Sequence, residues 1–160
     1  EFRRVLFRSM WLSGSLATVT KSDVNILAIC TILGISLALM TGKTCNLLSL
    51  EDKTSKSLGV DTTKQTIIIS AIAVFLASTS TGVGGVISFV GLIVPHIARF
   101  IIGSNHNYLI PFSAALGSIL LVLADTLGRT MFKPYEIPVG LVMSVIGAPF
   151  FIYLLKRRKR

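Results

Sequence analysis

Charged residues are scarce in this sequence. They make up 14% of its 160 residues, whereas soluble domains carry roughly 25%. The scarcity is uneven, because the stretches 24–41 and 65–98 contain no Asp, Glu, Lys or Arg. Long uncharged runs separated by charged clusters are typical of a chain that passes repeatedly between hydrocarbon and water. We therefore expect an all-α integral membrane fold.

Residues that carry chemistry are few as well. The sequence has two His and two Cys, and no acidic cluster accompanies His96 or His106. The glycine-rich stretch 82–85 lacks the lysine and the spacing of a phosphate-binding loop. We therefore expect this chain to be no enzyme and to bind no cofactor or metal, so that ATP work falls to a partner chain. Cys30 and Cys45 fit no metal or redox motif and are expected to be free thiols.

Acidic residues are outnumbered by basic ones, seven against sixteen, for a net charge of +9. A nucleic-acid-binding surface would interleave basic residues along an exposed face. Here the last five residues, 156–160, are all basic and directly follow an apolar run. Basic residues just outside an apolar span follow the positive-inside bias of membrane proteins. The charge therefore indicates a membrane protein and argues against a nucleic-acid partner.

Five membrane spans are expected from the uncharged runs. The first has eighteen residues, which at about 1.5 Å per residue covers about 27 Å of a hydrocarbon core roughly 30 Å thick. The run 65–98 is too long for one untilted span, so we divide it at the small residues 82–85 and expect Pro95 to kink its second half. The expected spans are 24–41, 65–81, 86–102, 109–127 and 137–155.

The distribution of basic residues predicts how these spans are oriented. A cytoplasmic C-terminus places the segments 42–64 and 103–108 inside, and the turns near residues 82 and 132 outside. Ten basic residues then lie inside and three outside, as the positive-inside bias requires. Segment 42–64 also contains leucines, among them Leu50 and Leu58, and a possible helix stop at Gly59. We interpret it as a short amphipathic helix that docks on a partner, in preference to a solvated loop.

Each group of charged residues near the span ends has two possible roles. His96 and Arg99 follow Pro95 at the end of a span, either as part of a transport path or gate or as interfacial anchors. Asp125 and Arg129 lie four apart on one helix face, either as an ion pair or with the arginine presented to a docking protein. Glu136, just before Pro138, suits either surface.

Four motifs together resemble one family of transport proteins. They are residues 89–99 (FVGLIVPHIAR), 123–129 (LADTLGR), 136–140 (EIPVG) and 146–151 (IGAPFF). Their order and spacing, from about Trp11 to Arg158, are similar to those of FecCD-type permeases. The first nine residues look unlike the rest, and Glu-Phe is what a common cloning site encodes, so we expect 1–9 to be a foreign leader and 10–160 a permease fragment.

The resemblance implies a fold and partners. FecCD-type permeases form the membrane channel of importers for iron-siderophores, haem and cobalamin in the bacterial cytoplasmic (inner) membrane, where they contact membrane lipids. Each subunit has ten spans, so this chain would be the second half of one. A second permease subunit, two ATPase subunits that bind ATP and magnesium, and an extracytoplasmic substrate-binding protein complete the system. Transport by alternating access would need all of these parts.

The resemblance also implies roles for particular residues. Leu50, Glu51, Leu58 and Gly59 match a loop that couples the permease to its ATPase. Arg129, together with Glu136, matches a surface that docks the binding protein. The remaining motif residues are candidates for the gate or for family-specific packing: Gly91, Pro95, His96, Arg99, Asp125 and Pro138.

Two other functions compete with the ATP-driven importer. An ion-coupled secondary transporter or channel fragment would need ionisable residues in the middle of its spans, and the charges here lie near span ends. A non-transporting membrane assembly subunit would need no coupling loop.

Overall fold

The computed structural model describes residues 13–16, 19–50, 61–131 and 137–158, and within these ranges the secondary structure is helical without strands. This confirms the all-α prediction. The helices are α2 (Lys21–Met40), α3 (Gly42–Leu48), α5 (Thr62–Gly84), α6 (Val90–Ile102), α7 (His106–Thr130) and α8 (Val139–Arg158).

Four helices in the described ranges are long and apolar enough to cross a membrane: Lys21–Met40, Thr62–Gly84, His106–Thr130 and Val139–Lys156. The helix α6 has 13 residues, which at about 1.5 Å per residue gives a length of about 20 Å, short of the hydrocarbon thickness. It begins at Val90 and not at residue 86, because Gly85 (φ 72°) and Phe89 (φ 67°) leave the helical region. The helix α5 runs past the expected limits 65–81 at both ends.

Polar side chains at three helix starts satisfy backbone N–H groups that have no partner within the helix. Thr20 and Asp23 form a capping box at α2. The Asp61 carboxylate accepts from the Lys64 N–H at 3.3 Å at the start of α5. The Asn105 side chain accepts from the Asn107 N–H at 3.1 Å at the start of α7. These caps fix where the spans begin.

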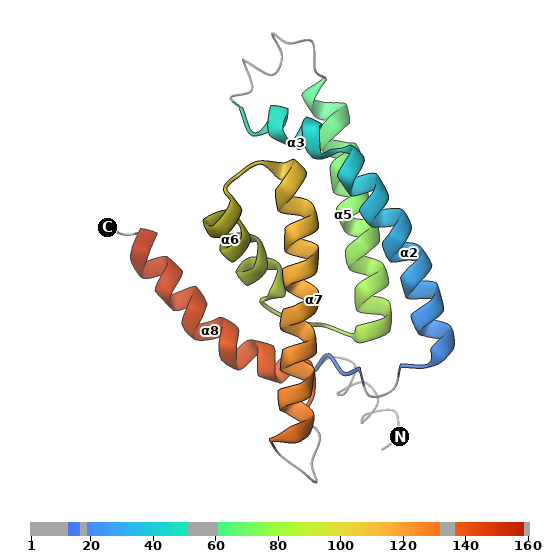
Figure 1. Cartoon of the computed structure of the whole chain (residues 1–160), viewed down its shortest axis with the longest axis vertical. Helices are drawn as coiled ribbons and strands as arrows, with labels where there is room; N and C mark the ends of the chain where they lie inside the picture. The colour runs from blue at the N-terminus through green and yellow to red at the C-terminus, as the bar shows by residue number, and fades with distance from the viewer. Residues whose placement is uncertain (1–12, 17–18, 51–60, 132–136, 159–160) are drawn as a thin grey trace.

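The helix α7 is central, and it packs against α2, α3, α6 and α8. The helix α2 packs against both α5 and α7, and Figure 1 shows these three helices running lengthwise through the molecule, with α6 and α8 on the other side of α7 and α8 slanting away from it. The helix α3 and residues 103–106 lie together at one end of the molecule, called here the α3 end. Residues 13–16, 85–89 and 137–140 lie at the opposite end, called here the Gly14 end. Segments 42–50 and 103–106 thus share a side, as the predicted alternation requires.

The buried core joins α6, α7 and α8 through Ile93, Ala124, Val139 and Met143. Close to it, the Gly140 N–H donates to the Gly14 carbonyl at 3.1 Å, and a methyl group on Gly140 would collide with the Ser13 carbonyl oxygen. A methyl group on Gly128 would lie 2.7 Å from the Ile137 carbonyl oxygen. Small residues permit such close approach where helices pack in lipid.

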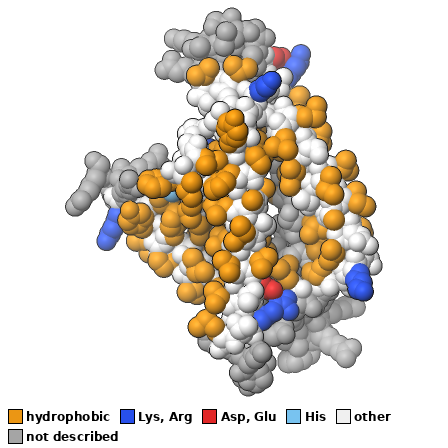
Figure 2. Space-filling model, viewed as in Figure 1, with side chains coloured by type: hydrophobic (Ala, Val, Ile, Leu, Met, Phe, Trp, Pro, Cys, Tyr) orange, Lys and Arg blue, Asp and Glu red, His pale blue; other side chains and the backbone are white. Residues whose placement is uncertain are grey.

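Hydrophobic side chains cover the middle of the visible face, whereas Lys, Arg and acidic side chains lie at its ends and margins (Figure 2). Val145 is 74% exposed and Phe100 is 77% exposed, and many other large apolar residues on the long helices are also exposed. Contiguous apolar surface of this extent is rare on soluble monomers. The chain is therefore part of a multi-pass membrane protein.

Candidate functional site

The predicted coupling segment begins at the α3 end. The structure describes residues 42–50 and 61–64 of it, so Glu51, Leu58 and Gly59 lie outside the described residues. Leu50 follows α3, donates its N–H to the Leu47 carbonyl at 3.2 Å, and is 47% exposed. The sequence predicted a short amphipathic helix within segment 42–64, and the structure has α3 in the first part of this segment, at Gly42–Leu48. Leu50 is thus available to a partner, whereas α3 faces the rest of the chain.

A hydrogen-bonded cluster ties α3 to the start of α7. The Asn46 Oδ1 accepts from the His106 backbone N–H at 2.7 Å and lies 2.8 Å from the His106 Nδ1. The Asn46 Nδ2 donates to the Asn105 Oδ1 at 2.9 Å. Both Asn46 carboxamide atoms are therefore used, and Asn105 binds α3 while it caps α7. We call Asn46, Asn105 and His106 the amide cluster.

Sequence reasoning missed the amide cluster. Asn105 carried a usable local signal, because Asn is a preferred residue immediately before a helix. The pairing of Asn46 with residues 59 and 60 positions away had no such signal. It depends on how α2 and α7 pack, which places the two segments at the same end.

The predicted docking residue Arg129 lies at the other end of α7. Its Nε donates to the Asp125 Oδ2 at 2.8 Å, and the two side chains are 43% and 25% exposed, respectively. The pairing that the spacing predicted is thus present, and it leaves the arginine accessible. Pro138 precedes α8, and its carbonyl accepts from the Leu141 N–H at 3.0 Å. Glu136 lies outside the described residues.

The motif on α6 does not meet Arg129 in space. His96 lies in the middle of α6 and Arg99 in its last turn, toward the α3 end, whereas Asp125 and Arg129 lie toward the Gly14 end. The His96 ring stands edge-on to Phe150, with 6.0 Å between ring centroids. Arg99 is exposed in the last turn of α6, where a positive charge favours the helix dipole.

Gly91 and Pro95 belong to the same motif on α6. Pro95 lies inside α6. A methyl group on Gly91 would meet no atom within 4 Å, so this side of α6 is open within the described part of the chain.

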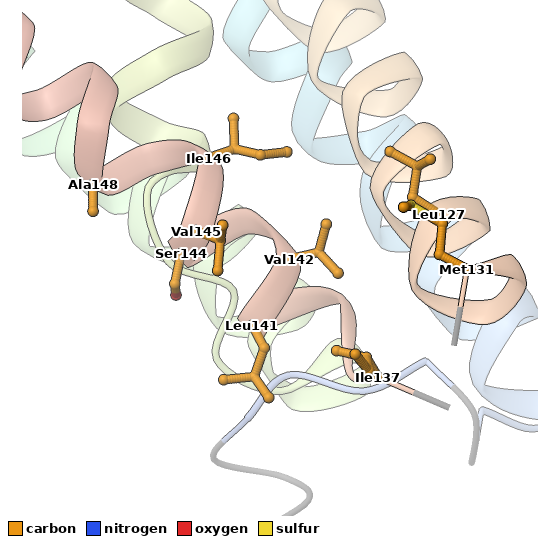
Figure 3. A pocket seen from close by; sticks show the side chains of 9 residues that line it. All are labelled: Leu127, Met131, Ile137, Leu141, Val142, Ser144, Val145, Ile146 and Ala148. Atoms are coloured by element: carbon orange, nitrogen blue, oxygen red, sulfur yellow. The ribbon is translucent and has the colours of Figure 1, made fainter. Parts of the chain in front are cut away.

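An open apolar groove lies between the end of α7 and the first half of α8 (Figure 3). Its volume is about 740 Å³, and its lining residues are Leu127, Met131, Ile137, Leu141, Val142, Ser144, Val145, Ile146 and Ala148. The one hydroxyl in this set, on Ser144, donates to the Gly140 carbonyl at 2.8 Å. The groove therefore presents hydrocarbon to whatever covers it.

No three His, Cys, Asp or Glu side chains in the described ranges come together in a way that could hold a metal ion. Cys30 and Cys45 are free, as expected. The sequence predicted that this chain is no enzyme and that it binds no cofactor, and both statements stay predictions.

Comparisons with known proteins identify relatives of the chain. The FecCD transport family matches residues 5–157. The chain is 44% identical over 147 residues to the "Fe(3+)-citrate import system permease protein YfmD" of Bacillus subtilis (strain 168), which covers 92% of this chain and 44% of that protein. It is 41% identical over 152 residues to the "Iron(3+)-hydroxamate import system permease protein FhuB" of the same strain, with 95% and 40% covered.

Two further relatives point the same way. The "Probable heme-iron transport system permease protein IsdF" of Staphylococcus aureus (strain Newman) is 40% identical over 139 residues, with 87% of this chain and 43% of that protein covered. A solved structure of a metal-chelate type ABC transporter in an inward-facing conformation matches with a TM-score of 0.83 at 32% identity. The matched region covers 92% of this chain and 47% of the chain in that solved structure. The chain thus spans less than half the length of these relatives.

Proposed function

Because the chain belongs to the FecCD transport family, we propose that it is the C-terminal half of the permease subunit of an ATP-binding-cassette importer for an iron chelate, such as iron-citrate, an iron-hydroxamate or haem. The observation that carries this proposal is the match of nearly the whole chain to permeases named for these three substrates. Cobalamin-type ligands belong to the same proposal through the family resemblance stated above.

The two ends of the molecule fit the two partners of such an importer. The segment 42–64 carries five Lys, Arg or acidic residues between positions 51 and 61, directly after the exposed Leu50. We place it in the cytoplasm, against the ATPase subunit, together with the basic C-terminus. Arg129 at the opposite end then faces the extracytoplasmic binding protein. ATP and magnesium belong to the partner ATPase.

The mechanism follows from this placement. ATP binding would close the ATPase pair and displace the coupling segment. The spans would then rock about a cavity formed with a second permease subunit, which exposes the substrate to one side of the membrane at a time. The exposed apolar surfaces of α2, α6 and α8 leave room for the other spans and for lipid. This half is not expected to transport without the rest of the permease.

Uptake into proteoliposomes tests the proposal. The full-length permease that contains this segment is reconstituted with its ATPase and its binding protein, and radiolabelled iron-citrate, iron-hydroxamate and haem are offered in turn. We expect uptake of one of them that requires ATP and stops when the ATPase carries a substitution that blocks hydrolysis. Uptake that continues with the inactive ATPase and follows an ion gradient would show a secondary transporter instead.

A further inference from the structure

The helix α3 is too short to hold its own position. A helix of seven residues is not stable alone in water, so its place is set by its neighbours. Its first residue, Gly42, is buried, and a methyl group there would lie 2.6 Å from the Asn107 Oδ1 and 3.4 Å from the Asn107 Cα. Four residues on, Asn46 makes the hydrogen bonds of the amide cluster. Residues four apart lie on one helix face, so one face of α3 rests on the first turn of α7.

The first turn of α7 depends on these contacts more than an ordinary helix start would. Pro111 lies inside α7 and has no N–H to donate to the carbonyl four residues earlier, that of Asn107. The helix ladder is therefore incomplete at the point where α3 binds. The Asn105 cap and the Asn46 acceptor hold the turn from outside.

The helix α7 connects the two ends of the molecule. It has 25 residues, which at about 1.5 Å per residue gives a length of about 37 Å. It packs against α2, α3, α6 and α8 and carries Arg129 close to its far end. A displacement of α3 that is passed to the first turn of α7 therefore reaches both the helices around α7 and the proposed docking residue.

We propose that Asn46, Asn105 and His106 are positioning residues that join α3 rigidly to α7, so that movement of the coupling segment is passed directly to α7. This inference rests on the proposed function, because it assigns the route by which the ATPase drives the spans. The two segments move as one body, and α3 does not slide on α7 during transport. The rival role is a purely structural one, in which the cluster stabilises the fold and transmits nothing.

The first test removes the carboxamide in the complete complex of permease, ATPase and binding protein. With Asn46→Ala we expect ATP-driven uptake to fall about 5- to 150-fold, the range usual for coupling between two sites. ATP hydrolysis without binding protein and the yield of assembled complex should stay at the level of the unmodified complex. The matched control is Asn25→Ala, at an exposed position near the opposite end of α2, which should leave uptake unchanged. Undiminished uptake with Asn46→Ala overturns the inference.

The second test replaces the polar connection by a covalent one. Gly42→Cys with Asn107→Cys places two thiols at positions close enough for a disulfide, since a Cβ at residue 42 would lie 3.4 Å from the Asn107 Cα. Cys30 and Cys45 are changed to Ser so that only the new pair can react. In a chain that also carries Asn46→Ala, oxidation should restore uptake and a reductant should abolish it again.

The same cysteine pair with Asn46 intact decides between a rigid connection and a sliding one. We expect its uptake to be equal in the oxidised and reduced forms. Uptake that the disulfide blocks would show that α3 must move relative to α7, which overturns the inference, as would failure of the disulfide to rescue Asn46→Ala. If the unmodified complex shows no ATP-driven uptake, the proposed function itself fails and the inference falls with it. Normal uptake in both the unmodified complex and Asn46→Ala overturns the inference alone.

Discussion

The two ends of the molecule differ in the kind of contact that stabilises each of them, which is between backbones at one end and between side chains at the other. At the Gly14 end, backbone meets backbone: the Gly140 N–H donates to the Gly14 carbonyl, and Gly14 itself lies against the Val86 carbonyl. At the α3 end, side chains make the connection, through the carboxamides of Asn46 and Asn105. The contacts at the Gly14 end therefore require glycines, which have no side chain, whereas the contacts at the α3 end require particular polar side chains.

This difference predicts how each end responds to substitution. A contact between backbones leaves no space for an added atom, because neither partner can rotate away as the end of a flexible side chain can. A contact between carboxamides is lost in steps, since each hydrogen bond contributes only about 0.5–1.5 kcal/mol. We expect the Gly14 end to tolerate little change and the α3 end to respond gradually. The α3 end is also the one that the proposed mechanism requires to be moved by a partner.

The largest expected effect is that of Gly140→Ala. The added methyl group would overlap the Ser13 carbonyl oxygen and lie 3.1 Å from the Val86 carbonyl oxygen, so α8 and residues 13–16 must separate. Forced overpacking of this kind costs about 1–3 kcal/mol, occasionally more. The measurement is thermal unfolding of the full-length permease in detergent, which should show a clear fall in midpoint.

A matched alanine substitution controls for the loss of glycine itself. Gly82 lies in the last turn of α5, and a methyl group there would meet no atom within 4 Å. Gly82→Ala should leave the midpoint unchanged or raise it slightly, because alanine is the better helix former. Equal midpoints for Gly140→Ala and Gly82→Ala would show that the backbone contact at the Gly14 end carries no stability.

Much of the fold was predictable because it depends on local or compositional signals. The uncharged runs located the long helices, and α5 ends at Gly84, among the small residues 82–85 at which the long run was divided but three residues beyond the predicted limit of 81. The start of α6 was not predictable in the same way. Phe89 adopts a left-handed conformation with φ 67°, which is uncommon for a residue other than glycine and has no signal in sequence. It packs against the core, and a methyl group on Gly147 of α8 would collide with its side chain, so this start depends on tertiary contacts.

A moderate effect is expected from Asn105→Ala, at the α3 end. It removes the cap of α7 and the acceptor for the Asn46 Nδ2 together, and the loss of such a cap costs about 1 kcal/mol. The matched variant is Asn105→Asp, whose carboxylate can accept both hydrogen bonds and favours the helix N-terminus. Thermal unfolding should rank Asn105→Asp near the unmodified protein and Asn105→Ala below it. Equal destabilisation by both variants would contradict the role of the Asn105 oxygen.

The candidate site residues were predictable to the extent that their partners are near in sequence. An ion pair between Asp125 and Arg129 was one of the two interpretations of their spacing, because residues four apart share a helix face, and the two side chains lie 2.8 Å apart. The link between Asn46 and His106 crosses 60 positions, and only the packed helices bring it about. The ion pair could therefore be anticipated from local spacing, whereas the amide cluster could not be predicted from the sequence pattern.

The smallest effect on stability is expected at Arg129, and there the function can be separated from the structure. Its pair with Asp125 is partly exposed, and such i,i+4 pairs contribute only about 0.3–0.5 kcal/mol. Asp125→Asn should therefore shift the unfolding midpoint little, and Arg129→Glu somewhat more, because it also places two carboxylates four residues apart at the C-terminal end of α7. If Arg129 docks the binding protein, only Arg129→Glu should weaken that complex, because Asp125→Asn keeps the arginine and releases it from its partner.

The loss of affinity caused by Arg129→Glu should be greater at low salt, since the screening length is about 30 Å at 0.01 M and about 8 Å at 0.15 M ionic strength. Affinity of the binding protein for the reconstituted permease, measured at both salt concentrations, checks this. Equal affinities for the two variants, with no dependence on salt, would leave Arg129 with the ion pair as its role and would move the docking surface to another part of the Gly14 end.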